Sequence, residues 1–343
     1  MLLRDNTIQQ LGKTGQVASF QVMETLVFDF EKVLQRHGIS IQTGSELEGA
    51  CCSVLEVLGK HNNKAILDPM EDVRKVYTEV LGIWTFLKKI VRLQNHPNLD
   101  QFVPHLALLN KGTVIQNKCL RACQDATNKI FELLFALVLL DVSTEVQLDH
   151  PSLAKGDNPD ILALIDGQRW GFACKTIYGQ SGKAFYDNLK KGVEQIDDSP
   201  ATIGCVVVNF RNLLSQETYW PILNDTAYSN GAEPIFAAYD QPEKVVAPKL
   251  WNDVALKAKQ VVDEIGAENV LSLFEGKKAL PAFMAFCQTV TGKDSAIGPI
   301  PTSIMTLAVH EFPHVLPHLS VFEKMNFALH ERQHHDASEE AKA

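Results

Sequence analysis

The residues best able to do chemistry together lie in one short segment, 157–177, which reads DNPDILALIDGQRWGFACKTI. Its Asp166-Gly167 pair separates two apolar, β-rich runs and is a strong signal for a two-residue hairpin turn. With that pair as the turn, Asp160 lies opposite Ala173 on the neighbouring strand. Side chains alternate along a strand, so Lys175 shares the same face. The sequence therefore predicts that these three positions meet, with cross-strand neighbours about 5 Å apart.

An aspartate, an acid at position 173 and a lysine would together make a hydrolytic metal site. Two opposed carboxylates repel each other, and a divalent cation removes that repulsion. Hard oxygen ligands suit magnesium, which also binds phosphate oxygens. A lysine beside the metal can orient or deprotonate the attacking water and stabilise phosphate charge. Position 173 is alanine in this chain, and alanine offers no ligand. We therefore expect magnesium binding and hydrolysis to be severely impaired.

Two flanking segments extend the pattern. Glu132 interrupts an otherwise apolar helical run, where a carboxylate would be costly if it were buried without a partner. Farther along the chain, Lys191 and Gln195 are four residues apart, so they lie on one face of a predicted helix. Both segments place polar side chains where they could approach the hairpin.

With these features, residues 128–209 resemble the PD-(D/E)XK nucleases, the superfamily with the restriction-endonuclease-like fold. Pro159-Asp160 matches the first half of its motif. Ala173-Cys174-Lys175 matches the second half in register, except that Ala173 stands where an aspartate or glutamate is expected. The resemblance implies a metal-dependent endonuclease that uses Mg²⁺, or Mn²⁺ in its place. It also implies DNA as the more common substrate, in restriction or in defence against foreign DNA.

The resemblance further assigns roles within the site. The metal ligands would be Asp160, an acid at position 173, the Cys174 carbonyl and Glu132. Lys175 would position the attacking water. Glu132 and Gln195 would complete the catalytic site through direct or water-mediated contacts.

The alanine at position 173 has two possible origins. It was introduced to inactivate an active enzyme, or the chain is naturally a catalytically dead nucleic-acid-binding or scaffold protein on the same fold. The other members of the site are intact. A pseudoenzyme that accumulates substitutions without selection for catalysis would more often lose several of them. The intact set favours an engineered alanine.

Basic residues near the hairpin are candidates for nucleic-acid binding. Lys183, Lys190 and Lys191 follow the second strand, and a further group, including Lys118 and Lys129, precedes or lies on the helix that carries Glu132. Such groups are commonly solvated faces. If they converge, they form a groove that follows the phosphates beside the site.

Other motifs are weaker. His310-Glu311-Phe312-Pro313-His314 has the letters of a zinc-protease helix, but a proline inside the required turn disfavours that helix. The seven cysteines include no CxxC pair and, with no apolar stretch at residues 1–10, indicate reduced thiols in a cytoplasmic protein. The net charge of −9 argues against nucleic-acid binding by bulk charge. We expect no membrane span and leave open a homo-oligomer or a partner subunit.

Hydrophobic periodicity predicts an N-terminal all-α domain followed by an α/β domain. The resemblance implies that the α/β domain is a restriction-endonuclease-like mixed sheet flanked by helices. The expected domains are residues 1–110 (helical), 111–240 (nuclease core) and 241–343 (a C-terminal helical extension). Helices are expected at 20–34, 47–58, 73–93, 113–140, 183–196, 254–265 and 320–332. Strands are expected at 144–148, 161–165, 170–177, 203–210 and 234–239.

Overall fold

The computed structural model describes residues 7–11, 16–62, 72–152, 158–224, 234–294, 300–312 and 318–330. Its strands are β1 (Thr7–Leu11), β2 (Gln16–Ser19), β3 (Glu145–Leu148), β4 (Ile161–Ile165), β5 (Gln168–Thr176), β6 (Ile203–Asn209), β7 (Ala279–Lys293) and β8 (Ile300–Glu311). Its α-helices are α1 (Phe20–Arg36), α2 (Glu46–Asn62), α3 (Val73–Arg92), α4 (Val103–Leu106), α5 (Asp125–Leu139), α6 (Gly182–Asp197), α7 (Gln216–Tyr219), α8 (Pro242–Ile265), α9 (Ala267–Ser272) and α10 (Leu319–Leu329). Short 3-10 helices occupy Asp100–Phe102 and Ala107–Asn110.

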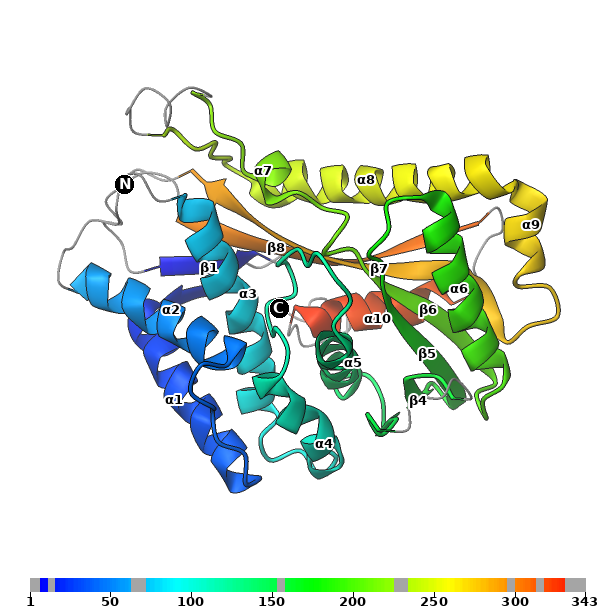
Figure 1. The fold of residues 1–343 in the computed structure, drawn as a ribbon, viewed down its shortest axis with the longest axis horizontal. Helices are drawn as coiled ribbons and strands as arrows, with labels where there is room; N and C mark the ends of the chain where they lie inside the picture. The colour runs from blue at the N-terminus through cyan, green and yellow to red at the C-terminus, as the bar shows by residue number, and fades with distance from the viewer. Residues whose placement is uncertain are drawn as a thin grey trace, which may run out of the picture.

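The strands form one mixed sheet in the order β2-β1-β8-β7-β6-β5-β4-β3 (Figure 1). Strands β5, β6 and β7 run parallel to one another, while β3, β4 and β5 are joined as antiparallel neighbours. The antiparallel strands β7 and β8 are the longest and continue the sheet toward β1 and β2. The predicted α/β class, with a mixed sheet between helices, is confirmed.

The hairpin that carries the candidate site has the predicted register. Ile165 pairs with Gln168 and Ile161 pairs with Phe172, so the next residues outward are Asp160 and Ala173. The turn residues Asp166 and Gly167 have φ values of 50° and 76°. Two successive positive φ angles are those of the tight turn that matches the twist of a hairpin, which is why an Asp-Gly pair is favoured there.

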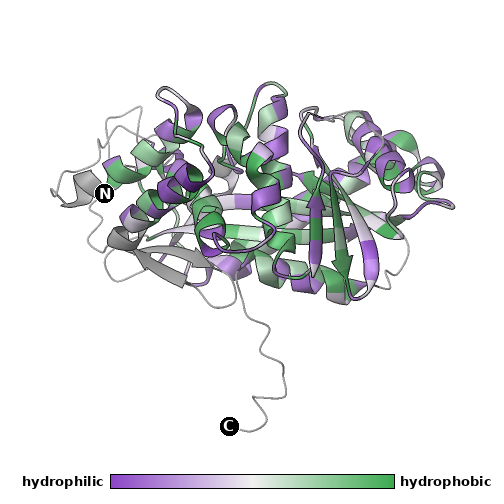
Figure 2. Ribbon diagram, turned by 90° about the horizontal axis from the view of Figure 1, so that it is seen from below, coloured by the Kyte–Doolittle hydropathy of each residue, from purple (hydrophilic) through white to green (hydrophobic). Residues whose placement is uncertain are grey.

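Helices cover both faces of the sheet and give the protein two hydrophobic cores. Helices α1–α3, α5 and α10 pack on one face, against alternate residues of β5 such as Trp170 and Phe172. Helices α6, α8 and α9 pack on the other face, against Ala173 and its neighbours on β6 and β7. Figure 2 shows the resulting alternation of hydrophobic and hydrophilic residues along the helices. A central sheet buried on both faces has apolar side chains at successive positions, as in β6, where residues 204–209 are all buried.

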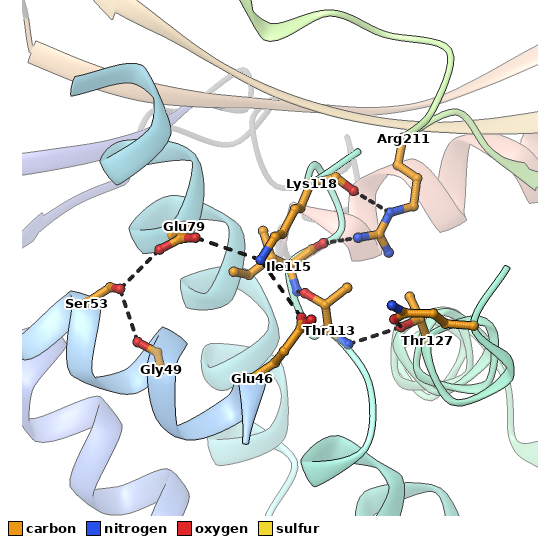
Figure 3. A network of polar contacts seen from close by, with 10 residues as sticks. Glu46, Gly49, Ser53, Glu79, Thr113, Ile115, Lys118, Thr127 and Arg211 are labelled. Atoms are coloured by element: carbon orange, nitrogen blue, oxygen red, sulfur yellow. Dashed lines mark hydrogen bonds and ion pairs between the residues drawn. The ribbon is translucent and has the colours of Figure 1, made fainter. Parts of the chain in front are cut away.

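The predicted helix at 113–140 is wrong in its first half. Helix α5 begins only at Asp125, and the preceding segment, residues 111–124, crosses between α3 and the sheet without helical structure. Figure 3 shows what holds that segment: the buried Arg211 guanidinium donates to the carbonyl oxygens of Ile115 and Lys118, at 2.6 and 2.7 Å. Long-range hydrogen bonds therefore replace the local bonds that a helix would have made.

The same segment connects the N-terminal helices to the rest of the molecule. The Lys118 ammonium lies 4.0 Å from a Glu46 oxygen on α2 and 3.9 Å from a Glu79 oxygen on α3 (Figure 3). These pairs are partly exposed and contribute little stability individually. They mark where α2 and α3 approach the segment that leads into α5.

The expectation of helices throughout residues 241–343 is also wrong. Residues 279–293 and 300–311 form β7 and β8, the long central pair of the sheet. Long runs of consecutive residues in both strands are buried, so the alternation that marks a half-buried strand is absent. The strand expected at 234–239 contributes only isolated bridges, Ile222 with Phe236 and Tyr239 with Lys293.

The sheet crosses both predicted domain boundaries. Strands β1 and β2 lie before residue 110, in the region expected to be all helical, and β7 and β8 lie after residue 240. The N-terminal helices also share one hydrophobic core with α5 and the sheet. In the part of the chain that the structure describes, no helix is both long enough and apolar enough to cross a membrane.

Candidate active site

A cleft of about 550 Å³ opens where the hairpin meets α5 and α6. Four of the residues predicted to act together converge beside it. Asp160 and Lys175 come from the hairpin, Glu132 from α5 and Gln195 from α6. The cleft is lined by Cys123, Asp125, Asn128, Lys129, Glu132, Pro151, Asp160, Cys174, Lys175, Thr176, Tyr178, Gly179 and Asn188.

Asp160 is fixed by the neighbouring strand. Its Oδ2 atom accepts a 2.7 Å hydrogen bond from the backbone N–H of Cys174 and lies 3.5 Å from the Lys175 Nζ atom. Lys175 in turn donates to the Gln195 Oε1 atom on α6. Asp160, Lys175 and Gln195 thus form one chain of contacts. A backbone N–H and an ammonium on one carboxylate are charge-assisted contacts that orient it firmly.

Glu132 is buried on α5, with only 4% of its surface exposed. Burial, followed by the nearby Asp160 carboxylate, raises the pKa of Glu132 well above its ordinary value. The Lys129 ammonium opposes that shift, since it donates a 2.8 Å hydrogen bond to the Glu132 Oε2 atom. The sequence prediction that a carboxylate in this apolar helix needs a partner is met by the lysine one turn earlier.

Lys129 is the residue whose place in the site the sequence did not reveal. Its Nζ atom lies 3.6 Å from the Asp160 Oδ1 atom as well as 2.8 Å from Glu132. Burial alone would lower the pKa of Lys129, but the charges of Glu132 and Asp160 outweigh burial and raise it. The i, i+3 spacing to Glu132 was a usable signal; the contact with Asp160 depends on how α5 docks against the hairpin.

Ala173 faces the other core. It is fully buried among apolar residues packed against α6, and a Cβ atom built on Gly192 would lie 3.4 Å from its own. It does not line the cleft. The Cys174 side chain is buried, and burial, together with the Asp160 and Glu132 charges, raises the pKa of its thiol well above the ordinary value. The Cys174 backbone N–H donates to the Asp160 carboxylate. The role of the Cys174 carbonyl as a metal ligand stays a prediction.

The residues present do not fit a magnesium ion as they stand. Among the described residues, no group of three His, Cys, Asp or Glu side chains is arranged to hold a metal. Asp160 and Glu132 are the acids at the centre, and Lys129 contacts both. The predicted set of metal ligands lacks the carboxylate expected at position 173. The Lys129 ammonium contacts both of the carboxylates that remain, Asp160 and Glu132.

The predicted nucleic-acid-binding lysines lie apart from this centre. Lys183, Lys190 and Lys191 are exposed on α6, and none of them lines the cleft. Lys183 and Lys190 approach Asp187 and Glu194 one turn along the helix, each at 3.9 Å. The rim instead carries Tyr178, whose hydroxyl donates a 3.0 Å hydrogen bond to the Asn128 side chain.

The segment that resembles a zinc-protease motif begins in a strand and not in a helix. His310 and Glu311 are consecutive residues of strand β8, so they do not form the helical turn that the motif requires. The His310 ring packs 5.4 Å from the Phe283 ring and 5.7 Å from the Phe312 ring, centre to centre. Pro313 and His314 lie outside the described residues.

Compared with family models, curated proteins and solved structures, the chain matches none of them. Its function is therefore inferred from the geometry of the site and from the motif that the sequence carries.

A pH effect on stability follows from His105, which is 1% exposed and lies on α4 beside the cleft network. Burial, and then the Lys129 charge, lowers its pKa from 6.5 to about 3. The unfolded chain thus binds the proton at a higher pH than the folded chain does. Stability conferred by the neutral imidazole is complete above pH 6.5 and decreases as the pH falls toward 3.

We expect the unfolding free energy of the wild type to fall more steeply with acidification than that of His105→Gln. The difference should approach about 1.4 kcal/mol per pH unit within that window. Urea titrations at several pH values measure both slopes. Equal slopes would contradict the burial of a neutral His105.

Proposed function

We propose that the cleft binds a phosphodiester group of nucleic acid, DNA by preference, and that the centre belongs to a restriction-endonuclease-like nuclease. The observation that carries the proposal is the contact chain from Asp160 to Lys175 to Gln195, with Glu132 beside it. The order of these residues along the chain, helix, hairpin and helix, is that of the family the motif resembles.

The cleft offers two ammonium groups to a phosphate, beside the carboxylates of Asp125, Glu132 and Asp160 that also line it. Lys129 and Lys175 both line it, with side chains that are 15% and 13% exposed. Ammonium groups in a partly desolvated cleft attract phosphate more strongly than they would in bulk water. In this role Lys175 holds a phosphate oxygen and orients the attacking water, while Gln195 fixes the direction of the lysine.

Cleavage requires a further carboxylate at position 173, where Mg²⁺ or Mn²⁺ would be the metal in the active form. The chain with Ala173 then binds nucleic acid without cutting it, which is the second candidate function. The contact of Lys129 with both remaining acids favours this second function for the chain as it stands. The codon for residue 173 in the gene separates an engineered alanine from a native one.

Binding tests the proposal directly. We expect Lys175→Met to weaken the binding of a fluorescent DNA duplex about tenfold, because one charge-assisted phosphate contact is lost. The salt dependence of binding should also become shallower by about one unit. Fluorescence anisotropy at several salt concentrations, with single-stranded DNA and RNA as further probes, measures both quantities.

The matched control is Lys259→Met, which removes one positive charge from an exposed lysine on α8. Lys259 does not line the cleft, so its loss should leave the affinity nearly unchanged. If both variants bind as the wild type does, or if both weaken equally, the cleft is not the binding site.

A further inference from the structure

The two acids at the centre of the cleft are joined by a lysine of the same chain. Asp160 comes from the hairpin and Glu132 from α5, and the Lys129 ammonium lies 3.6 Å from an oxygen of the first and 2.8 Å from an oxygen of the second. All three side chains are largely buried. Two buried carboxylates held this close need a positive charge between them, and here an ammonium supplies it.

The remaining oxygen of Asp160 is also engaged. Its Oδ2 atom accepts from the Cys174 N–H and faces Lys175, while its Oδ1 atom faces Lys129. A magnesium or manganese ion needs several oxygen ligands at short range and in a regular arrangement. Such an ion would have to displace Lys129, and it would be repelled by the ammonium until it did.

A second observation points to the same position. The His105 Nε2 atom, on α4, lies 3.8 Å from the same Glu132 oxygen that binds Lys129. It is buried and, within the described residues, makes no hydrogen bond. A neutral imidazole nitrogen is a common metal ligand. Helix α4 thus places an imidazole nitrogen without a hydrogen bond beside Glu132, one of the two acids.

We propose that Lys129 is an internal cation that occupies the metal position of this centre and lowers its affinity for divalent ions. The inference rests on the proposed function, because it treats Asp160 and Glu132 as the acids of a hydrolytic centre. Removal of the ammonium leaves the Asp160 and Glu132 carboxylates without the cation that they share, and a divalent cation restores the charge balance.

Direct metal binding by the full chain tests this. Mn²⁺ is the probe, titrated without nucleic acid and followed by electron paramagnetic resonance of the free ion. We expect Lys129→Met to bind one Mn²⁺ roughly 10- to 100-fold more tightly than the wild type, because a charged competitor is gone. Adding Asp160→Asn to that variant should abolish the gain. The control Lys259→Met, at an exposed position of α8 that does not line the cleft, should behave as the wild type does.

Wild-type binding as tight as that of a folded Lys129→Met variant would overturn the proposal, and so would a gain of equal size in Lys129→Arg, which keeps a cation in place. If Lys129→Met fails to fold by circular dichroism, Lys129→Gln keeps a hydrogen-bond donor to Glu132 and gives the same readout. Since no nucleic acid is present, a gain in Mn²⁺ affinity supports this inference even if the DNA-binding experiment fails.

Discussion

Ala173→Glu is expected to convert the chain into a Mg²⁺-dependent nuclease, with plasmid cleavage at least about 100-fold above that of the parent. This figure is a lower bound, because even residues behind the first ligands of a metal change activity by about 10- to 100-fold. The physical reason is charge. Two carboxylates now face two ammonium groups, those of Lys129 and Lys175. A third carboxylate allows a divalent cation to compete with Lys129.

The geometry makes this a demanding change. Ala173 is fully buried beside α6, so the new side chain must extend along β5 toward the cleft that Lys175 lines. Ala173→Asp is the shorter alternative, and Ala173→Gln is the matched control, since it has the size of glutamate without its charge. Adding Asp160→Asn to Ala173→Glu should abolish cleavage.

Cleavage is measured on supercoiled plasmid and on single-stranded DNA, with and without Mg²⁺, after circular dichroism has shown that each variant is folded. If Lys129 still competes too strongly, Ala173→Glu combined with Lys129→Met should cleave at lower Mg²⁺ than the single variant. Inactivity of both folded proteins at millimolar Mg²⁺ or Mn²⁺ would contradict the nuclease proposal.

The hairpin shows how far local sequence can predict a site. Asp166-Gly167 determines the turn, and counting outward from it placed Asp160 beside Ala173 and Lys175 in the register that the structure has. Glu132 was found because a single carboxylate in an apolar helix needs a polar or charged partner if it is buried. Gln195 was found because the nuclease family that the motif resembles often has a glutamine or lysine on the helix after the lysine strand. Each of these inferences uses residues close together in sequence.

The features of the fold and the site that the sequence did not predict depend on contacts between segments that are distant along the chain. A helix was expected from residue 113, but Arg211, nearly a hundred residues later, binds the carbonyl oxygens of Ile115 and Lys118 in a segment of turns and bends. Strands β7 and β8 are buried on both faces, so the periodicity that identifies a strand is lost. Lys129 was visible as a helical neighbour of Glu132, but its contact with Asp160 depends on the packing of α5 on the hairpin.

Gly204→Ala is expected to destabilise the fold by about 3 kcal/mol or more, near the upper end of the usual cost of overpacking. Gly204 on β6 pairs with Gly171 on β5, the strand that carries Lys175. A Cβ atom at Gly204 would lie 2.4 Å from the Gly171 carbonyl oxygen and 2.5 Å from the Ile196 side chain. The first contact is with backbone, so only a shift of the strands or of α6 could relieve it.

Such a shift would also disturb the cleft, since Gln195 precedes Ile196 on α6 and holds Lys175. We therefore expect Gly204→Ala to lose DNA affinity along with stability. The matched control is Gly49→Ala in the exposed part of α2, where a new Cβ would meet nothing within 4 Å. That change should instead stabilise the protein by about 1 kcal/mol, the difference in helix propensity.

Urea unfolding followed by circular dichroism measures both variants on one scale. A Gly204→Ala protein as stable as the wild type would show that β5 and β6 do not approach each other as closely as the two glycines allow. The position of Lys175 relative to α6 would then need revision, because the side-chain contact with Gln195 depends on that close approach.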